Sequence, residues 1–317
     1  MEVLRGAKEH PADTRPTVVT VGMFDGVHRG HRMLFDRVFE EAKRLHARSA
    51  VVTFEPHPLE VLAPDKAPCI LTTLDQRIAL FADAGFDVAL VLPFNRELAA
   101  LSPLEFAREA LVEELHVRKV LVGEDFRFGH DRAGNVAMLA DIGKTEGFEC
   151  EAVGLLGGDE GKISSSDVRL LLREGLVDGA ASLLGRGYRL AGEVVHGDRR
   201  GRELGFPTAN IKPHPRACLP ALGVYAGWWC WDGRRLPAAI NVGVRPTFKT
   251  NDPPLAEVFV LDFDGDLYGA HAEVEFTAHL RPELKFDSAD ALVAQMDEDV
   301  ARTRQVLAGL YTGENPS

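Results

Sequence analysis

The chain has few cysteines and no long hydrophobic run. Its 317 residues include only four cysteines, which lie far apart in the sequence and form no CxxC pair or Cys/His cluster: Cys69, Cys150, Cys218 and Cys230. This spacing indicates neither a zinc site nor a disulfide framework, so we expect four free thiols. No apolar run approaches the roughly 18 residues of a membrane span, and the N-terminus lacks the apolar core of a secretory signal. These absences predict a cytoplasmic protein that does not enter the membrane.

An excess of basic residues is also absent. The chain carries 36 Lys+Arg against 48 Asp+Glu, a net charge of −12. Nucleic acids and anionic membranes attract basic surfaces, so we expect neither as a partner. Phosphate ligands would then be held by local basic residues, loop amides and Mg²⁺. The length and the 45% hydrophobic content are enough for two cores, so we expect two domains.

The most informative stretch is residues 22–31, GMFDGVHRGH, between a short β-branched run at 17–21 and a helical pattern. The stretch is therefore a loop from a strand to a helix. We expect Gly22, Gly26 and Gly30 to give the backbone unusual dihedrals and a close approach to a ligand. A helix N-terminus offers unpaired N–H groups, which favour phosphate.

Two histidines stand at the end of this loop. His28 and His31 are three residues apart, so both imidazoles can face one phosphate if the helix begins near them. Two donors there can neutralise charge while a phosphorus centre is attacked. The pair can equally be helix caps or surface residues. A metal pair is disfavoured because no third ligand is close in sequence.

The rest of the first half alternates short β-type runs with helical patterns. Strands are expected at 49–54, 88–92, 119–122 and 149–153, and helices at 74–84, 103–115 and 136–147. This alternation predicts right-handed crossovers and a parallel sheet, whose ligands bind at the carboxyl ends of the strands.

Two further loops carry polar and aromatic groups. Phe126 and Arg127 lie in the loop 123–129, which directly follows a predicted strand, and a planar ring system could stack on the aromatic side chains there. Ser164, Ser165 and Arg169 begin a helical pattern, so their hydroxyls and guanidinium are suited to an anion. Taken alone, the serine run is better explained as a plain helix cap.

From residue 188 onward the pattern changes to short strands and turns, followed by one amphipathic helix at 288–307. This pattern predicts a small β-barrel with a terminal helix. We place the boundary near Gly185, with domains at 1–184 and 185–317. Three arginines at 199–202 could instead form an RNA-binding patch, although the acidic background disfavours it.

The motifs together resemble one family. GMFDGVHRGH resembles the HxGH signature of nucleotidylyltransferases in the form found in prokaryotic FAD synthetases, and 163–169 resembles their ISSTxxR motif with Ser166 in place of threonine. Residues 199–210 resemble the GRGRxLGFPTAN motif of riboflavin kinases, with matching segments at 223–227, 240–248 and 257–269. Nearly the whole chain thus resembles the bifunctional riboflavin kinase/FAD synthetases of prokaryotes.

The resemblance implies a Rossmann-like nucleotidylyltransferase domain with a parallel sheet, followed by a riboflavin-kinase-type barrel. Riboflavin and ATP would give FMN in the barrel, and FMN and ATP would give FAD and pyrophosphate in the first domain. Both are phosphoryl or nucleotidyl transfers, so Mg²⁺ is expected in each site.

For the kinase, the resemblance implies that Glu257 accepts the proton of the attacking hydroxyl. Thr208 and Asn210 would hold Mg²⁺ and phosphate, and Gly205 would let the nucleotide approach closely. Relatives usually have histidine two residues after the glutamate, where this chain has Phe259. Without the resemblance, Glu257 would be read as an exposed strand carboxylate.

For the adenylyltransferase, the resemblance implies that His28 and His31 stabilise the α-phosphate. Ser164, Ser165 and Arg169 would hold the β- and γ-phosphates. Phe126 and Arg127 are predicted on the flavin side, and four loop residues are predicted to bind ATP: Gly22, Phe24, Asp25 and Gly30. A capping role for Asp25 fits equally well.

Two rival functions remain. One is a nucleotidylyltransferase with another phosphate acceptor, which a neighbouring kinase domain disfavours. The other is a non-catalytic flavin sensor or RNA-binding regulator that uses the arginine patch. The sequence leaves open whether the chain forms a homo-oligomer.

Overall fold

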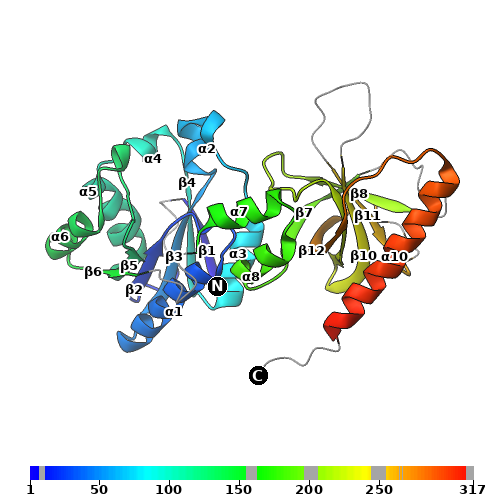
Figure 1. Cartoon of the computed structure of the whole chain (residues 1–317). Coiled ribbons are helices and arrows are strands. Elements are labelled where there is room, and N and C mark those ends of the chain that lie inside the picture. The colour runs from blue at the N-terminus through cyan, green and yellow to red at the C-terminus, as the bar shows by residue number, and fades with distance from the viewer. Residues whose placement is uncertain are drawn as a thin grey trace. The chain divides into compact units, whose positions relative to one another are not determined.

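The computed structural model describes residues 1–6, 11–154, 163–195, 206–243, 255–263, 265 and 267–311. The chain forms two compact units (Figure 1). The first contains Met1–Pro68 and Leu74–Ser164, and the second contains Cys69–Thr73 and Ser165–Ser317. The sequence predicts a boundary near Gly185. The division in the structure instead assigns residues 165–184 to the second unit, where they pack against the barrel core.

The first unit is built on a parallel sheet of six strands in the order β1-β4-β3-β2-β5-β6. The predicted parallel sheet is confirmed, because all of its pairs are parallel. The strands are β1 (Glu2–Arg5), β2 (Thr17–Val21), β3 (Arg48–Glu55), β4 (Val88–Pro93), β5 (Val117–Gly123) and β6 (Glu149–Val153).

Helices cover both faces of this sheet. Successive strand residues point to opposite faces, so Val18 packs against α1 and α3 while Val19 packs against α5 and α6. Both layers are apolar, which explains why the strands are continuous hydrophobic runs. The main helices are α1 (Arg29–Arg44), α3 (Leu74–Ala84), α5 (Pro103–Phe106), which continues as a π-helical segment (Ala107–Glu113), and α6 (Val136–Glu146).

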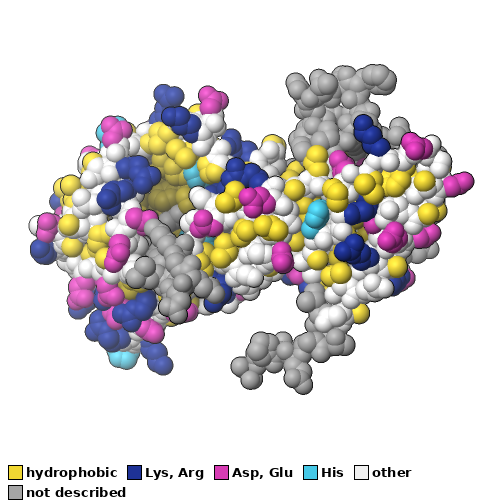
Figure 2. All heavy atoms as spheres, in the orientation of Figure 1, with side chains coloured by type: hydrophobic (Ala, Val, Ile, Leu, Met, Phe, Trp, Pro, Cys, Tyr) yellow, Lys and Arg dark blue, Asp and Glu magenta, His cyan; other side chains and the backbone are white. Residues whose placement is uncertain are grey.

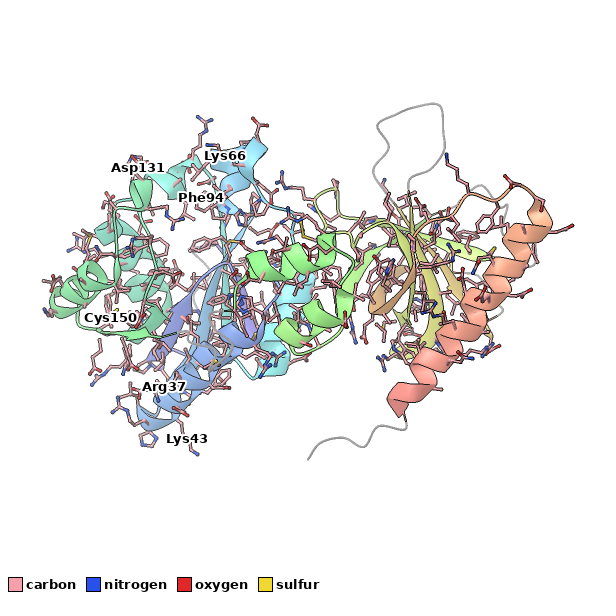
Figure 3. The ribbon with its side chains drawn as sticks, in the orientation of Figure 1. Arg37, Lys43, Lys66, Phe94, Asp131 and Cys150 are labelled. Atoms are coloured by element: carbon pink, nitrogen blue, oxygen red, sulfur yellow. A yellow bond between two sulfur atoms is a disulfide. The ribbon has the colours of Figure 1, made fainter. Side chains whose placement is uncertain are left out.

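Shorter helical segments lie near the carboxyl ends of the strands. Phe94 lies just beyond the end of β4, whereas Arg37 and Lys43 on α1 lie at the opposite end of the unit (Figure 3). Strands β3 and β4 are added on one side of β2, and β5 and β6 are added on its other side. The direction of strand addition reverses at β2, so the loop after β2 lies at a topological switch point. The short segments are α2 (Pro58–Leu62), α4 (Arg96–Ala100) and the 3₁₀ turns Pro64–Lys66 and His130–Arg132.

The second unit contains the predicted barrel. Six antiparallel strands close in the order β10-β11-β8-β7-β12-β9, around a core that includes the fully buried Trp229, Tyr225 and Phe276. The strands are β7 (Tyr188–Val195), β8 (Thr208–Pro213), β9 (Gly223–Trp231), β10 (Arg234–Gly243), β11 (Leu255–Val260) and β12 (His271–Arg281).

In the described part of the second unit, three helices accompany the barrel: α7 (Ser165–Arg173), α8 (Val177–Leu184) and α10 (Ala289–Tyr311). Leu307 of α10 packs on Val224 and Trp228 of β9, which confirms the terminal helix and covers part of the outer face of the barrel. A bidentate ion pair between Arg281 and Asp299 joins β12 to this helix, with N–O distances of 2.6 and 2.9 Å.

The expectation of four free thiols is wrong for two of them. Cys69 and Cys218 form a disulfide, although 149 residues separate them in sequence. The segment 69–73 lies against the stretch before β9, where Ile70 accepts a backbone hydrogen bond from Cys218 and donates one to Arg216. Distance in sequence concealed this pair because the fold returns the two segments to each other. Cys150 and Cys230 are free.

Candidate functional site

The loop after β2 has an unusual backbone. Gly26 has a φ of +83°, as predicted, but Gly22 and Gly30 do not take left-handed dihedrals. Phe24 and Val27 do so instead, with φ values of +51° and +40°. Non-glycine residues rarely adopt this region, so tertiary contacts must hold the loop in place.

Two glycines of the loop are needed for space rather than for dihedral freedom. A Cβ at Gly22 would lie 2.9 Å from the ring of Phe24, and one at Gly30 would lie 3.2 Å from Nδ1 of His28. The Phe24 ring is buried among Phe35 and Phe81, so its side chain is part of the core. Of Phe24, only the backbone is left to contact a ligand.

His28 is the N-cap of α1. Its Nδ1 accepts a hydrogen bond from the backbone N–H of His31 at 3.3 Å, so Nδ1 carries no proton. The single ring proton of His28 is therefore on Nε2, where it can be donated to a ligand. His28 is buried, at 3% exposure. Because α1 begins at Arg29, both histidines lie at its N-terminus, which is the condition expected from the sequence for them to face one phosphate.

His31 stacks on His28. The ring centroids are 3.6 Å apart and the planes differ by 18°. Burial, and next the neighbouring His28, lower the pKa of His31 well below its ordinary value of 6.5. His31 is thus neutral near pH 7 in the free protein, and the two rings can stabilise a developing phosphate charge by hydrogen bonding.

Aromatic side chains gather at the carboxyl ends of the sheet. Phe126 stacks on Phe128 with centroids 5.4 Å apart, and Phe54 contacts Phe94 at 5.9 Å. The rings of Phe54, Phe94 and Phe126 are all half-buried. Figure 2 shows hydrophobic side chains lining a hollow in the first unit beside α2. The sequence pointed to Phe126 but not to Phe54 or Phe94. Phe54 lies near the end of β3 and Phe94 directly follows β4, so from the sequence both look like core residues.

The two other predicted contacts of this unit differ in exposure. Arg127 is exposed and donates to the carbonyl oxygen of Phe126 at 2.9 Å. Asp25 is buried, at 4% exposure, within the loop after β2.

The serine stretch begins a helix, as predicted. Ser165 is the first residue of α7, and Arg169 lies one turn further on. Arg169 is buried, and its Nε donates to the carbonyl oxygen of Cys69 at 2.7 Å. Ser164 belongs to the first unit, while Ser165 and Arg169 belong to the second. A role for these three residues in binding phosphate stays a prediction.

The barrel brings the predicted kinase residues together by strand register. Glu257 of β11 pairs with Asn210 of β8 on one side and with Asn241 of β10 on the other. Directly opposed residues share a face and lie close together, so the three side chains form a row on the outer face of the barrel. Asn210 is buried, at 2% exposure, and Glu257 is half-buried. The motif reading missed Asn241 as a member of this row.

Thr208 lies on the same face as Asn210, two residues before it. It pairs with Phe259, whose ring contacts Phe206 at 5.2 Å. Phe259, which replaces the histidine usual in relatives, therefore adds an aromatic contact beside the row, and Glu257 still pairs with Asn210. Gly205 and the arginine patch at 199–202 lie outside the described residues.

Comparisons with known proteins match both units. The family model of FAD synthetase matches residues 10–167, and that of riboflavin kinase matches residues 184–307. The parallel α/β unit and the small barrel thus correspond to two transferase domains in one chain.

Curated relatives match the chain over nearly its full length. The bifunctional riboflavin kinase/FMN adenylyltransferase of Pseudomonas fluorescens is 41% identical over 97% of this chain and 98% of its own length. The protein of the same name from Escherichia coli is 40% identical over 96% of this chain and 97% of its own. The chain belongs to the bifunctional riboflavin kinase/FMN adenylyltransferase family.

A solved structure has the same overall fold. The protein from Streptococcus pneumoniae described as a macrolide-efflux protein has a TM-score of 0.85 and 30% identity, over 96% of this chain and 99% of that one. Among the described residues, no helix is both long and apolar enough to span a bilayer.

Proposed function

We propose that this chain makes FAD from riboflavin in two steps, one in each unit. Family membership defines the activities, riboflavin kinase in the second unit and FMN adenylyltransferase in the first. Two observations support the assignment of residues: the His28–His31 stack at the start of α1, and the Asn210–Glu257 pair in the barrel. The Asn210–Glu257 pair is the observation that supports the kinase residues, because the register of β8 and β11 brings together two motif residues that are far apart in sequence.

In the adenylyltransferase, a phosphate oxygen of FMN attacks the α-phosphorus of ATP, and pyrophosphate leaves. No protein nucleophile is required, so the protein positions the reactants and stabilises charge. His28 can donate from Nε2, because its Nδ1 is occupied by the helix cap. Ser164, Ser165 and Arg169 are proposed to bind the β- and γ-phosphates on the basis of their motif.

In the kinase, a riboflavin hydroxyl attacks the γ-phosphorus of ATP. The Glu257 carboxylate is proposed to accept the hydroxyl proton. Thr208 and Asn210 fit a Mg²⁺ site because their side-chain oxygens are the hard donors that this ion prefers, and Mg²⁺ in such sites usually takes few protein ligands and several from phosphate. Bound Mg²⁺ would neutralise charge on the transferred phosphoryl group.

The flavin ring is proposed to bind beside Phe126, where Phe54 and Phe94 offer further half-buried aromatic surface. Aromatic rings stack favourably on a planar ring system, and this group lies at the carboxyl ends of the strands where the motif loop also ends. The exposed Arg127 is proposed to bind a charged group of the ligand. A cytoplasmic location and a homo-oligomer stay predictions.

Incubation of the purified chain with riboflavin, ATP and Mg²⁺ tests the proposal. Chromatography should show FMN first and FAD later, with ADP and pyrophosphate as co-products. Phosphopantetheine or a nicotinamide nucleotide in place of FMN should give no adenylylated product. Efficient use of either compound would favour the rival acceptor, and a lack of any flavin product would leave a binding function.

A further inference from the structure

We infer that Arg77 is a positioning residue for adenylyl transfer, because it holds the peptide between Met23 and Phe24 at the end of β2. Arg77 lies on α3 and is 2% exposed. Its Nη1 donates to the carbonyl oxygen of Met23 at 3.0 Å. The inference rests on the adenylyltransferase function proposed above for the loop after β2.

The other contacts of Arg77 fix the guanidinium itself. Nη1 lies 3.3 Å from Oγ1 of Thr53 and 3.4 Å from the carbonyl oxygen of Phe54, and Nη2 forms an ion pair with Glu55. These three residues end β3, the strand beside β2. Because Glu55 neutralises the charge, Arg77 acts here through the geometry of its donors rather than as a free cation.

The carbonyl oxygen of Met23 has a second donor, the Thr53 hydroxyl at 3.1 Å. In a trans peptide the C=O and the N–H point in opposite directions. Two donors on the oxygen therefore turn the N–H of Phe24 away from Arg77. Within the described part of the chain, this N–H has no protein hydrogen-bond partner, so it is available to a ligand at the end of β2.

The peptide is also held against its local preference. The φ of Phe24, which adjoins this peptide, is +51°. On the far side, the Phe24 ring is fixed in the core by edge contacts with Phe35 and Phe81. An N–H fixed on both sides, in the loop that leads into α1, is a preorganised donor for phosphate charge, and Arg77 supplies one of the two hydrogen bonds that hold its peptide.

Substitution of Arg77 tests this role in the full chain. Arg77→Met should lower kcat for FMN adenylylation about 10- to 100-fold, because small misplacements at a reacting centre are costly, while the KM for ATP changes less than about threefold. Arg77→Lys should recover part of the rate, since it keeps one donor but not the fork. Riboflavin phosphorylation by the same chain should be unchanged and measures the amount of folded second unit, while circular dichroism of the same sample measures folding of the first.

Arg48→Met is the matched control. Arg48 is also buried, at 7% exposure, and begins β3, at the opposite end of the strand from Thr53. It bonds to the Glu2 carboxylate at 2.8 Å and the Asp13 carbonyl oxygen at 3.0 Å. Its loss should destabilise the unit but leave kcat within about twofold. An equal loss of kcat in both variants would make Arg77 a merely structural residue and overturn the inference.

A second variant covers failure of Arg77→Met to fold. Thr53→Val removes the other donor to Met23 with little change in shape and should lower kcat about 3- to 10-fold, whereas Thr53→Ser should keep the wild-type rate. Wild-type kcat in both Thr53→Val and Arg77→Lys would also overturn the role of Arg77. A wild-type chain that makes no FAD from FMN and ATP would instead overturn the proposed function.

Discussion

The imidazole rings of His28 and His31 stack face to face, 3.6 Å between centroids, at the first turn of α1. Two charged rings at this separation would repel each other strongly, and the cap from Nδ1 of His28 already requires that nitrogen to be unprotonated. The arrangement places two imidazole rings at a helix N-terminus, where they can donate to a phosphate.

Replacement of His28 should stop the pathway at FMN. His28→Asn keeps a side chain that can cap α1 but removes the imidazole, so we expect about a 10²- to 10³-fold lower rate of FAD formation with normal folding. Riboflavin phosphorylation in the same sample is the control. If His28→Asn formed FAD at the wild-type rate, the ring would be only a cap.

Gly30→Ala should impair the same step through sterics. The added Cβ would lie 3.2 Å from Nδ1 of His28 and 3.4 Å from the carbonyl oxygen of Ile163, so the stacked ring must shift. We expect about a tenfold lower kcat for FAD formation. Gly309→Ala is the control, because no atom of the described residues beyond its own stretch of helix lies within 4 Å of the added Cβ, and it should leave kcat unchanged. Full activity of Gly30→Ala would show that the stack tolerates displacement.

Loss of the Glu257 carboxylate should affect only the first reaction. Glu257→Gln keeps the shape of the side chain but cannot accept a proton, so FMN formation should fall about 10²- to 10⁴-fold. Conversion of supplied FMN to FAD should continue. Glu193→Gln, on an exposed position of β7, is the matched control. If the variant lost FAD formation instead, the assignment of reactions to units would be wrong.

His31 should make the protein less stable in mild acid. Because the folded pKa lies well below 6.5, the unfolded state binds the proton first as the pH falls, and stability decreases below about pH 6.5. Above that pH, His31 is neutral in both the folded and the unfolded state, so it does not change the dependence of the unfolding free energy on pH. His31→Phe should flatten this part of the profile, as measured by urea midpoints followed by circular dichroism between pH 5 and 7.5. A slope that is unchanged in His31→Phe would contradict this prediction.

Reduction should destabilise the second unit. The Cys69–Cys218 bond closes a long loop, and its loss is expected to cost about 2–4 kcal/mol. All three tryptophans lie in this unit, at 228, 229 and 231, so their fluorescence reports its unfolding. Dithiothreitol should lower the midpoint of the wild type but not that of the Cys69→Ala, Cys218→Ala double variant. Thiol titration that finds four free thiols before reduction would contradict the bond.

The sequence predicted the elements well because their signals are local. The alternation of β-branched runs and helical periods indicated the parallel sheet, and Ser102 with Glu105 forms a capping box where the helix expected at 103–115 begins. Residues 74–84 form a helix with the predicted bounds. The sequence did not predict β1, the edge strand beside β4, because the short Glu2–Arg5 run has no distinctive period.

Arg77 shows why part of the site could not be predicted. It follows Leu74 by three residues, on the face of α3 that also carries the buried Phe81, and an arginine there gives no indication of its partners. Those partners belong to two other segments, the loop after β2 and the end of β3. Only the fold brings the three segments together.

By itself, the sequence determined the alternation of strands and helices in the first half, the change to short strands in the second, and the motif residues that carry the family resemblance. These follow from local periodicity and from short strings of defined chemistry. The tertiary structure decided which groups meet: the stack of His28 on His31, the Asn210–Glu257 register, the disulfide and the contact of Arg77 with Met23. Each depends on distances set by packing between segments far apart in the chain, which no local pattern records.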